Sequence, residues 1–446
     1  MLANDPYAAR RIYHFTHISN LPNIVKNGIL STNKLKFLER RHKSIASTDI
    51  QSRRSEMDVT CGPGGKVHDY VPLYFTSRSP MLLGVINKRC IDQSDIVYLE
   101  FPISLIRRSD VVYTDASANT SVPPNFYYSY EDLKKLNWPE IDSTRWSSET
   151  DELRHQKMAE VLVKDHLSLS DCVEIVVWDR VTKSFIEEKF KEAGLQLPLV
   201  GIENYTRRHW FTDWKESNQE SIVAGPKEIA RNLEKACSQI SKAHTIDSNK
   251  IYSDLDHLIK EMDANIKSIP ELNVLFRLKP ENPIHKYDLG SHTQSVVNIL
   301  RSLDRFKSLS NDDKSLVIAS AYLHDIGKAS KIEQNGHIYK NDINHPVKGL
   351  PIAVRILGRI KNISEDDAIK ILRLICYHDL IGDLMKGDRE LSELLNITKN
   401  QSDIDMLLAL SEADIKSINA SWWDASKAEI IRAACISHIV ENHQND

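Results

Sequence analysis

The chain has 446 residues, of which 41% are hydrophobic and 27% charged, and a formal net charge of −4. This length exceeds one ordinary hydrophobic core and predicts two or three domains, and the six scattered cysteines lack the Cys-x-x-Cys spacing of a disulfide framework or a zinc knuckle. No apolar run approaches the length of a membrane span and the first residues lack a basic-then-apolar signal, so we expect a cytoplasmic protein without a membrane partner.

The amino-terminal half has the mixed pattern of an α+β domain. A helix is predicted at about 20–28, ended by Gly28. Short β-type runs follow at 70–75, 96–101, 111–113 and 173–178, separated by segments rich in Pro, Gly and Ser. Residues 31–69 have few apolar anchors, and the glycine-rich run 61–65 is typical of a loop that could fold over a ligand.

This half also begins with a basic segment. Residues 1–70 hold 11 Lys and Arg against 6 Asp and Glu, a charge of +5. The basic side chains bunch between 34 and 54, at Lys34, Lys36, Arg40, Arg41, Lys43, Arg53 and Arg54. Such local charge suits a phosphate-bearing partner, although charge alone is equally compatible with a solvated loop.

Four motifs of this half, at 12–17, 50–54, 68–81 and 154–163, are indecisive singly. In this order and spacing they resemble the DarT family of NAD-dependent DNA ADP-ribosyltransferases, toxins that modify bases of single-stranded DNA, over about residues 11–212. The resemblance implies an α+β ADP-ribosyltransferase-like fold, NAD as cofactor, single-stranded DNA as partner, a toxin or anti-phage defence role and a possible antitoxin protein.

The chemistry of this family agrees with the residues. Breaking the bond between nicotinamide and ribose creates positive charge on the ribose, which a nearby carboxylate stabilises. Glu160 matches the family's catalytic glutamate, and Arg54 its essential arginine, which grips the NAD pyrophosphate. Further cofactor-binding candidates, each of which could instead have only a packing or solvated role, are His14, Thr16, Arg53, Tyr70 and Arg78.

A polar stretch and a helical connector divide the chain. The stretch 213–225 is polar, and 226–268 carries apolar residues at helical spacing. We therefore predict an ADP-ribosyltransferase-like domain at 1–212, a boundary and connector at 213–270, and an all-α domain at 271–446.

The carboxyl-terminal half places metal-ligating residue types on apolar helix faces. His292 lies on the stripe of Leu289, Val296 and Ile299, and Asp414 on that of Leu407 and Ile418. A buried unpaired carboxylate is costly, so Asp414 requires a partner. His324 and Asp325 adjoin in sequence, and these four residues can supply nitrogen and oxygen ligands to Mn, Fe, Zn or Mg. His345 and His378 make a second metal possible.

This order of ligands resembles the HD superfamily of all-α metal-dependent phosphohydrolases, over about residues 285–440. The resemblance places the metal ligands at His292, His324, Asp325 and Asp414, with His345 and His378 as the extra histidines of two-metal members. It also implies that Lys328 contacts a phosphate, although a solvated cation at a helix end is an equal alternative.

Three functional hypotheses follow. The first is an enzyme that transfers ADP-ribose from NAD to a nucleobase of single-stranded DNA, with an HD domain that hydrolyses or senses a phosphate-containing nucleotide. In the second, the HD phosphohydrolase is the main activity, and the first half binds a nucleic acid or dinucleotide. In the third, the HD domain is not an enzyme and regulates the transferase.

Overall fold

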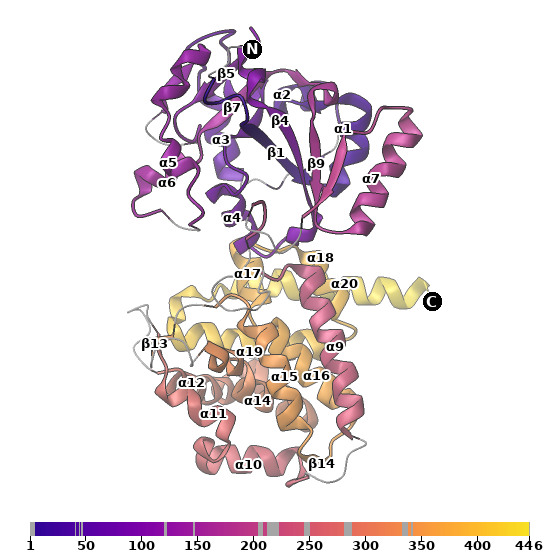
Figure 1. Ribbon diagram of the computed structural model, residues 1–446. Coiled ribbons are helices and arrows are strands. Elements are labelled where there is room, and N and C mark those ends of the chain that lie inside the picture. The colour runs from indigo at the N-terminus through magenta and orange to yellow at the C-terminus, as the bar shows by residue number, and fades with distance from the viewer. Residues whose placement is uncertain are drawn as a thin grey trace. The chain divides into compact units, whose positions relative to one another are not determined.

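The structure is a computed structural model that divides into two compact units (Figure 1). It describes residues 5–40, 42–43, 45, 48–119, 123–145, 148–203, 208–211, 223–244, 250–280, 288–331, 338–339 and 342–445. Unit 1 comprises Met1–Asn87 and Ile91–Val223, and unit 2 comprises Lys88–Cys90 and Ala224–Asp446. Residues 213–222 of the predicted boundary lie outside the described residues, and the domain limits at 212 and 270 stay predictions. No helix in the described ranges is long and apolar enough to cross a membrane.

Unit 1 is built on a sheet with the strand order β10-β9-β4-β1-β3-β7-β5-β6. Only β9 and β10 pair in parallel among the described strands of this sheet. The strands are β1 (Arg11–His17), β3 (Tyr70–Tyr74), β4 (Ile96–Pro102), β5 (Val111–Thr114), β6 (Phe126–Tyr127), β7 (Glu160–Lys164), β9 (Glu174–Val177) and β10 (Leu199–Ile202). A small second sheet pairs β2 (Ile29–Leu30) with β8 (His166–Leu167).

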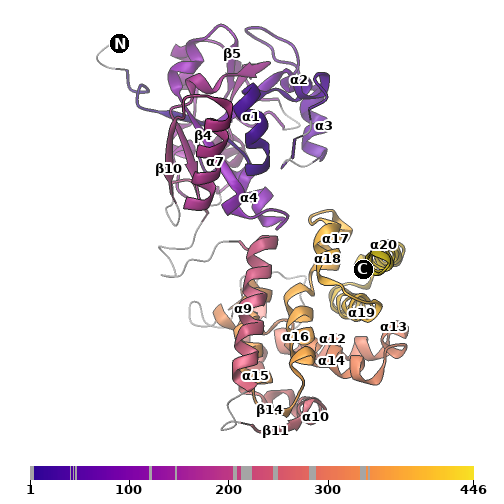
Figure 2. The ribbon, with the colours of Figure 1, turned by 90° about the vertical axis from the view of Figure 1, so that its right-hand side faces the viewer.

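The helices of unit 1 surround this sheet (Figure 2). They are α1 (Leu21–Asn27), α2 (Thr32–Phe37), α3 (Thr48–Glu56), α4 (Pro80–Asn87), α5 (Trp138–Ile141), α6 (Asp151–Lys157) and α7 (Arg180–Ala193). Helix α1 ends as predicted, because Gly28 follows it with a φ of 68° that suits glycine. The α+β prediction for this half is confirmed.

Unit 2 is helical apart from short strands, which confirms the all-α prediction for its HD region. The predicted connector forms α9 (Pro226–His244) and α10 (Leu255–Asn265), with β11 (Tyr252–Asp254) before the second of them. Strand β11 pairs with β14 (Ile360–Asn362), and β12 (Lys279–Pro280) with β13 (Ile338–Tyr339). The remaining α-helices are α11 (Pro270–Asn273), α12 (Leu289–Ser302), α13 (Asp304–Lys307), α14 (Asn311–Leu323), α15 (His345–Leu357), α16 (Glu365–Tyr377), α17 (Leu380–Lys386), α18 (Leu391–Ile397), α19 (Gln401–Ile418) and α20 (Ala425–Asn445).

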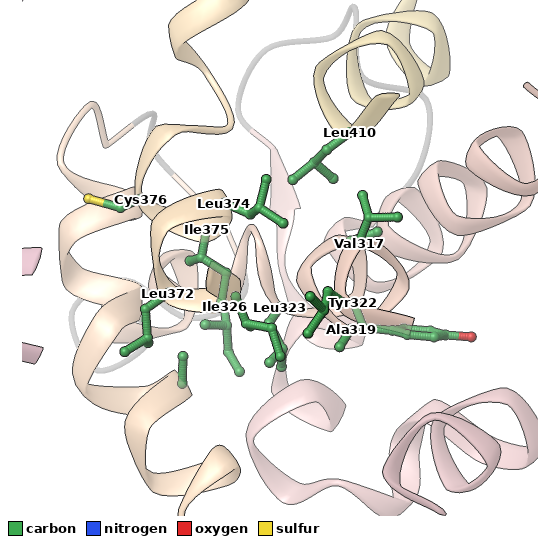
Figure 3. Close-up of a cluster of buried hydrophobic side chains, with 14 of the residues drawn as sticks. Val317, Ala319, Tyr322, Leu323, Ile326, Leu372, Leu374, Ile375, Cys376 and Leu410 are labelled. Atoms are coloured by element: carbon green, nitrogen blue, oxygen red, sulfur yellow. The ribbon is translucent and has the colours of Figure 1, made fainter. Parts of the chain in front are cut away.

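The core of unit 2 forms where α12, α14, α16 and α19 pack on one another. Figure 3 shows Val317 and Leu323 of α14 facing Leu374 and Ile375 of α16, with Leu410 of α19 above them. All five side chains are buried. Because full burial of one such aliphatic side chain stabilises by about 1.5–3 kcal/mol, this core holds the helix ends that carry polar residues in fixed positions.

A buried polar cluster fastens the end of unit 1 to its sheet. The ring of His209 is fully buried; its Nε2 lies 2.8 Å from Oε1 of Glu100 on β4, and its Nδ1 contacts Glu203. Burial acts to lower the pKa of His209, but the hydrogen bonds and charges of the two carboxylates outweigh it and raise this pKa. The other polar and charged groups around the cluster are Tyr13, Tyr98, Glu174 and Arg208.

We predict that His209→Gln destabilises the protein most at low pH. The protonated ring stabilises the folded state fully below its ordinary pKa, and that contribution is lost as the pH rises through the raised folded pKa. The loss should reach about 3 kcal/mol near pH 6, since Glu100 then keeps only the more distant Arg208 as a cationic partner among the described residues, and be smaller near pH 9.5. Urea unfolding of both proteins at the two pH values measures it. An equal loss at both would contradict the assignment of charge to His209.

Candidate functional site

A cavity opens on one side of the sheet in unit 1. Strands β1 and β3, helices α1 to α3 and the described residues between α2 and α3 contribute to its wall. Its lining residues are His14, Phe15, Thr16, Asn20, Asn23, Ile24, Gly28, Ile29, Leu30, Thr32, Leu35, His42, Lys43, Ile45, Ile50, Gln51, Arg54, Val67, His68, Tyr70, Pro72, Tyr74, Met81 and Asn119. Three predicted cofactor-binding residues, His14, Thr16 and Tyr70, are therefore brought together with Arg54.

Glu160 and Arg54 form a buried ion pair beside this cavity. Glu160 begins β7 directly opposite Tyr74 of β3, and its Oε1 accepts hydrogen bonds from Nη1 of Arg54 (2.8 Å) and the backbone amide of Ala118 (2.9 Å). Burial acts to lower the pKa of Arg54, but the Glu160 carboxylate raises it, so the guanidinium stays charged. The buried Oε2 of Glu160 has no hydrogen-bond partner among the described residues. One carboxylate oxygen is thus held while the other can accept a new bond.

The histidine of β1 is held in one tautomer. Nδ1 of His14 lies 2.9 Å from the carbonyl oxygen of Pro72, and because a carbonyl only accepts, Nδ1 carries the proton. Burial lowers the pKa of His14, which favours the neutral ring with a lone pair on Nε2. Thr16 accepts a hydrogen bond from Asn20 (3.0 Å), and Tyr70 donates one to the carbonyl of Gly64 (2.7 Å).

Two other predicted residues of unit 1 are not among those lining the cavity. Arg53 is exposed, whereas its neighbour Arg54 is buried. Arg78 is buried, and its Nη2 donates to the carbonyl of Thr144 (3.1 Å).

Sequence reasoning missed Lys157, a fully buried lysine whose Nζ donates to the carbonyl oxygens of Ser143 (3.0 Å) and Arg145 (2.7 Å). Burial lowers the pKa of Lys157 to about 8. Arg78 and Lys157 together hold the backbone of 143–145.

The structure brings all six predicted metal ligands of unit 2 together in two groups. In the first group, Nε2 of His292 lies 3.1 Å from Oδ1 of Asp414 and 3.4 Å from Oδ2 of Asp325, and Nε2 of His324 lies 3.5 Å from the same Oδ2. The second group lies around the other oxygen of Asp325. Oδ1 is 3.2 Å from Nε2 of His345 and 4.0 Å from Nε2 of His378. Asp325 therefore belongs to both groups.

Each of these histidines has its second ring nitrogen engaged. Nδ1 of His324, His345 and His378 lies 2.8 Å from the carbonyl oxygen three residues earlier in each case. His324 and His378 follow the last residues of α14 and α16, where backbone carbonyls lack helical partners. A carbonyl only accepts, so Nδ1 carries a proton in each ring, and Nε2 is the nitrogen that faces the centre. Burial acts to lower the pKa of His324, but the charges of Asp325 and Asp414 raise it to about 9, so a metal ion that binds this Nε2 must displace a proton from it.

These groups fit a divalent cation. Nε2 of His324 and Oδ1 of Asp325 are buried and have no hydrogen-bond partner among the described residues, which would be costly without a ligand. The donor set of imidazole nitrogens and carboxylate oxygens suits Mn, Fe, Zn or Mg. Nζ of Lys328 lies 2.7 Å from Oδ2 of Asp325, so its ammonium is beside the cluster.

Sequence reasoning missed one acidic neighbour of the second group. Oδ1 of Asp379 lies 3.3 Å from Nε2 of His378, and Oδ2 lies 3.8 Å from Nε2 of His345. A signal was present, since His378 and Asp379 repeat the His-Asp pair of 324 and 325 at the end of another buried helix.

A close backbone approach sets the distance between Asp325 and His345. A Cβ on Gly327 would lie 1.9 Å from the carbonyl oxygen of His345 and 2.5 Å from the amide nitrogen of Gly349. Only glycine therefore lets the segment after Asp325 touch the first turn of α15.

We predict that Gly327→Ala weakens metal binding at the second group while the first keeps its ligands. The added methyl must push α15 away, at about 1–3 kcal/mol of stability, and a displaced His345 should lower metal affinity there about 10-fold or more. Metal per chain by elemental analysis, after dialysis at graded free metal, measures this. Gly84→Ala, whose Cβ meets nothing within 4 Å, is the control. Unchanged metal content in Gly327→Ala would refute the spacing role.

Known proteins resemble the two parts of the chain separately. A family model described as ssDNA thymidine ADP-ribosyltransferase, DarT, matches residues 13–212, and a model of the HD domain matches residues 289–409. A DNA ADP-ribosyl transferase of Thermus aquaticus is 33% identical over 208 residues, which are 45% of this chain and 88% of that protein.

Solved structures of DarT from Thermus sp. 2.9 also match. The complex with ADP-ribosylated ssDNA is 30% identical with a TM-score of 0.41 and covers 46% of this chain and 98% of the matched one. The complex with NAD⁺ is 28% identical with a TM-score of 0.39, covering 45% and 98%. The sequence similarity to the Thermus aquaticus enzyme spans most of that enzyme, so the chain belongs to the DarT family through its amino-terminal half and carries an HD domain in its carboxyl-terminal half.

Proposed function

We propose that unit 1 transfers ADP-ribose from NAD to a nucleobase of single-stranded DNA, with thymidine as the first acceptor to test. The observation that carries the proposal is the buried Arg54–Glu160 pair beside the cavity. It presents a charged carboxylate with one oxygen held by Arg54 and Ala118 and the other without a partner among the described residues.

Glu160 has two tasks in this reaction. When the bond between the ribose C1″ and the nicotinamide nitrogen breaks, nicotinamide leaves with the electron pair, and Glu160 stabilises the positive charge on the ribose. A nitrogen of the base then bonds to C1″, and the proton it loses passes to the Oε2 side of Glu160. Arg54 orients this carboxylate through Nη1, and its other N–H groups are donors for the NAD pyrophosphate.

Other residues of the cavity hold the donor. Neutral His14 offers Nε2, and Thr16 its hydroxyl, to the nicotinamide and its ribose. Tyr70 contributes to the wall of the cavity. The proposal also includes the toxin or anti-phage defence role and an antitoxin protein as partner, which DarT family membership supports.

We predict that the full chain adds one ADP-ribose to a thymidine-containing single-stranded oligonucleotide in the presence of NAD. Glu160→Gln keeps the size of the side chain and removes its charge, and Arg54→Ala removes the partner of Glu160. Each should lower the rate about 100-fold or more. Mass spectrometry of the oligonucleotide measures the adduct.

Arg53→Ala is the matched control, because Arg53 is exposed beside the buried Arg54, and its rate should stay within about twofold of wild type. Full activity of Glu160→Gln would refute the assigned role. An absence of adduct on oligonucleotides of all four bases would refute the function.

For unit 2 we propose a divalent metal centre that hydrolyses or senses a phosphate-containing nucleotide. The supporting observation is that the side chains of the six predicted ligands converge in two groups around Asp325. A bound cation there would polarise a phosphoryl oxygen and lower the pKa of a bound water. Residues of the chain would position this cation, because backbone carbonyls orient the imidazoles that face it. The ammonium of Lys328 adds positive charge for a phosphate.

We predict that the purified chain retains divalent metal and cleaves phosphomonoester or phosphodiester probes, including nucleotides. His324→Ala should lower metal affinity about 10- to 100-fold and abolish cleavage, because its Nε2 is a ligand. His257→Ala, with a side chain 42% exposed in the same unit, should match wild type. Elemental analysis and phosphate release measure both. Metal retention without cleavage would refute hydrolysis and favour sensing, and no retained metal would refute the centre.

A further inference from the structure

The short helix α2 presents an exposed aromatic ring beside the cavity of unit 1. Thr32 and Leu35 of this helix line the cavity, whereas Phe37 at its end leaves 80% of its surface exposed. The next residue, Leu38, is 42% exposed. A large exposed ring that adjoins a binding cavity indicates contact with another molecule.

Basic side chains flank this ring. Nζ of Lys34 lies 5.9 Å from the centre of the Phe37 ring, and Lys36 and Arg40 are exposed on either side of it in the sequence. None of the three cations pairs with a carboxylate in the described part of the chain. The one acidic residue between Thr32 and Arg40 is Glu39. The surface therefore combines net positive charge with a flat apolar ring.

The α2 segment is anchored at both ends. The hydroxyl of Ser31, which is fully buried, accepts from the amide of Lys34, and Asn33 donates to Asp69 (2.8 Å). After the helix, the amide of Arg40 donates to the carbonyl of Leu35 (2.9 Å). Both α2 and α3 contact the turn at Val67–Asp69. The backbone that carries Phe37 is thus fixed on both sides rather than forming a frayed end.

We propose that α2 is a docking surface for the strand that flanks the acceptor nucleotide. An unpaired base stacks on Phe37, while Lys34, Lys36 and Arg40 contact the phosphates on either side of it. This inference rests on the proposed transferase function and deepens it by naming a contact to the strand outside the cavity. Aromatic rings interleaved with cations suit a single strand, because every base has a stacking face and every linkage a negative charge.

The charge of this surface favours single-stranded DNA as its occupant over a second copy of the chain or a membrane. A second copy of the chain would bring the same positive surface against itself, and like charges brought together are unfavourable. A membrane surface would require several apolar side chains on one face, whereas α2 offers one ring and one leucine.

The test is direct binding of labelled single-stranded DNA to the full chain, by fluorescence anisotropy, in a Glu160→Gln background that prevents turnover. Phe37→Ala and Phe37→Leu should each raise the Kd roughly 5- to 100-fold, and Phe37→Trp should restore it, because stacking requires a ring. Val181→Ala, at a site 79% exposed on α7, is the matched control for loss of an exposed apolar side chain. Lys36→Ala should reduce the slope of log Kd against log salt by about 1.

A second measurement locates the stacked base. Abasic sites are placed in turn on each side of the acceptor, and the effect of Phe37→Ala should vanish at one position. An unchanged Kd for Phe37→Ala, a loss not restored by tryptophan, or an altered oligomeric state with unaltered DNA binding would each overturn the inference. These outcomes are independent of the transferase assay. If DNA binding depends on Phe37 but no adduct forms, the proposed function is refuted and the docking surface is not.

Discussion

Within each unit, buried carboxylates and the partners that they require determine which segments meet at the candidate site. Moving one ionised side chain out of water costs several kcal/mol, so a folded chain that buries one must bring a cation or hydrogen-bond donors to it. Glu160 obtains Arg54 from 106 residues earlier in the sequence, and Glu100 obtains His209 from 109 residues later. Asp325 lies among histidines from three other helices. Each of these pairings joins segments that are distant in the sequence. The pairings of Glu160 and Asp325 form part of the candidate sites, and the pairing of Glu100 fastens the fold of unit 1.

The same requirement leads to two kinds of chemistry. In unit 1 a single carboxylate faces one guanidinium, which balances its charge and leaves one of its oxygens without a partner among the described residues. In unit 2 several carboxylates face imidazoles whose outer nitrogens are already engaged by backbone carbonyls. A guanidinium cannot give up its charge, whereas neutral imidazoles add no positive charge, so the carboxylates of unit 2 are only partly compensated by Lys328 and Arg89. The second arrangement therefore calls for an external cation and the first does not.

Local patterns were enough to predict much of this from the sequence. Gly28 ended its helix where a positive φ was needed, and the apolar stripes around His292 and Asp414 placed both residues inward. No local pattern predicted three other features, because they depend on which loops meet across the sheet. These are the hydrogen bond from the amide of Ala118, the burial of Lys157 and the contact of Arg78 with Thr144. Asp379 was predictable in principle from the repeated His-Asp pair.

The charges around Asp325 give a physical reason for the phosphate chemistry that we propose for unit 2. Asp325, Asp414 and Asp379 supply three negative charges, and Lys328 and Arg89 supply two positive charges, so with neutral imidazoles the cluster has a formal charge of −1. In that state it repels a phosphate. One divalent cation would bring the cluster to +1, and one in each of the two groups would bring it to +3. Because the interaction of charges a few ångströms apart is strong inside a protein, a first cation would make the site attract an anionic substrate, and a cation in the second group would strengthen that attraction. Gly327, which sets the position of His345, thereby acts on the charge of the whole centre.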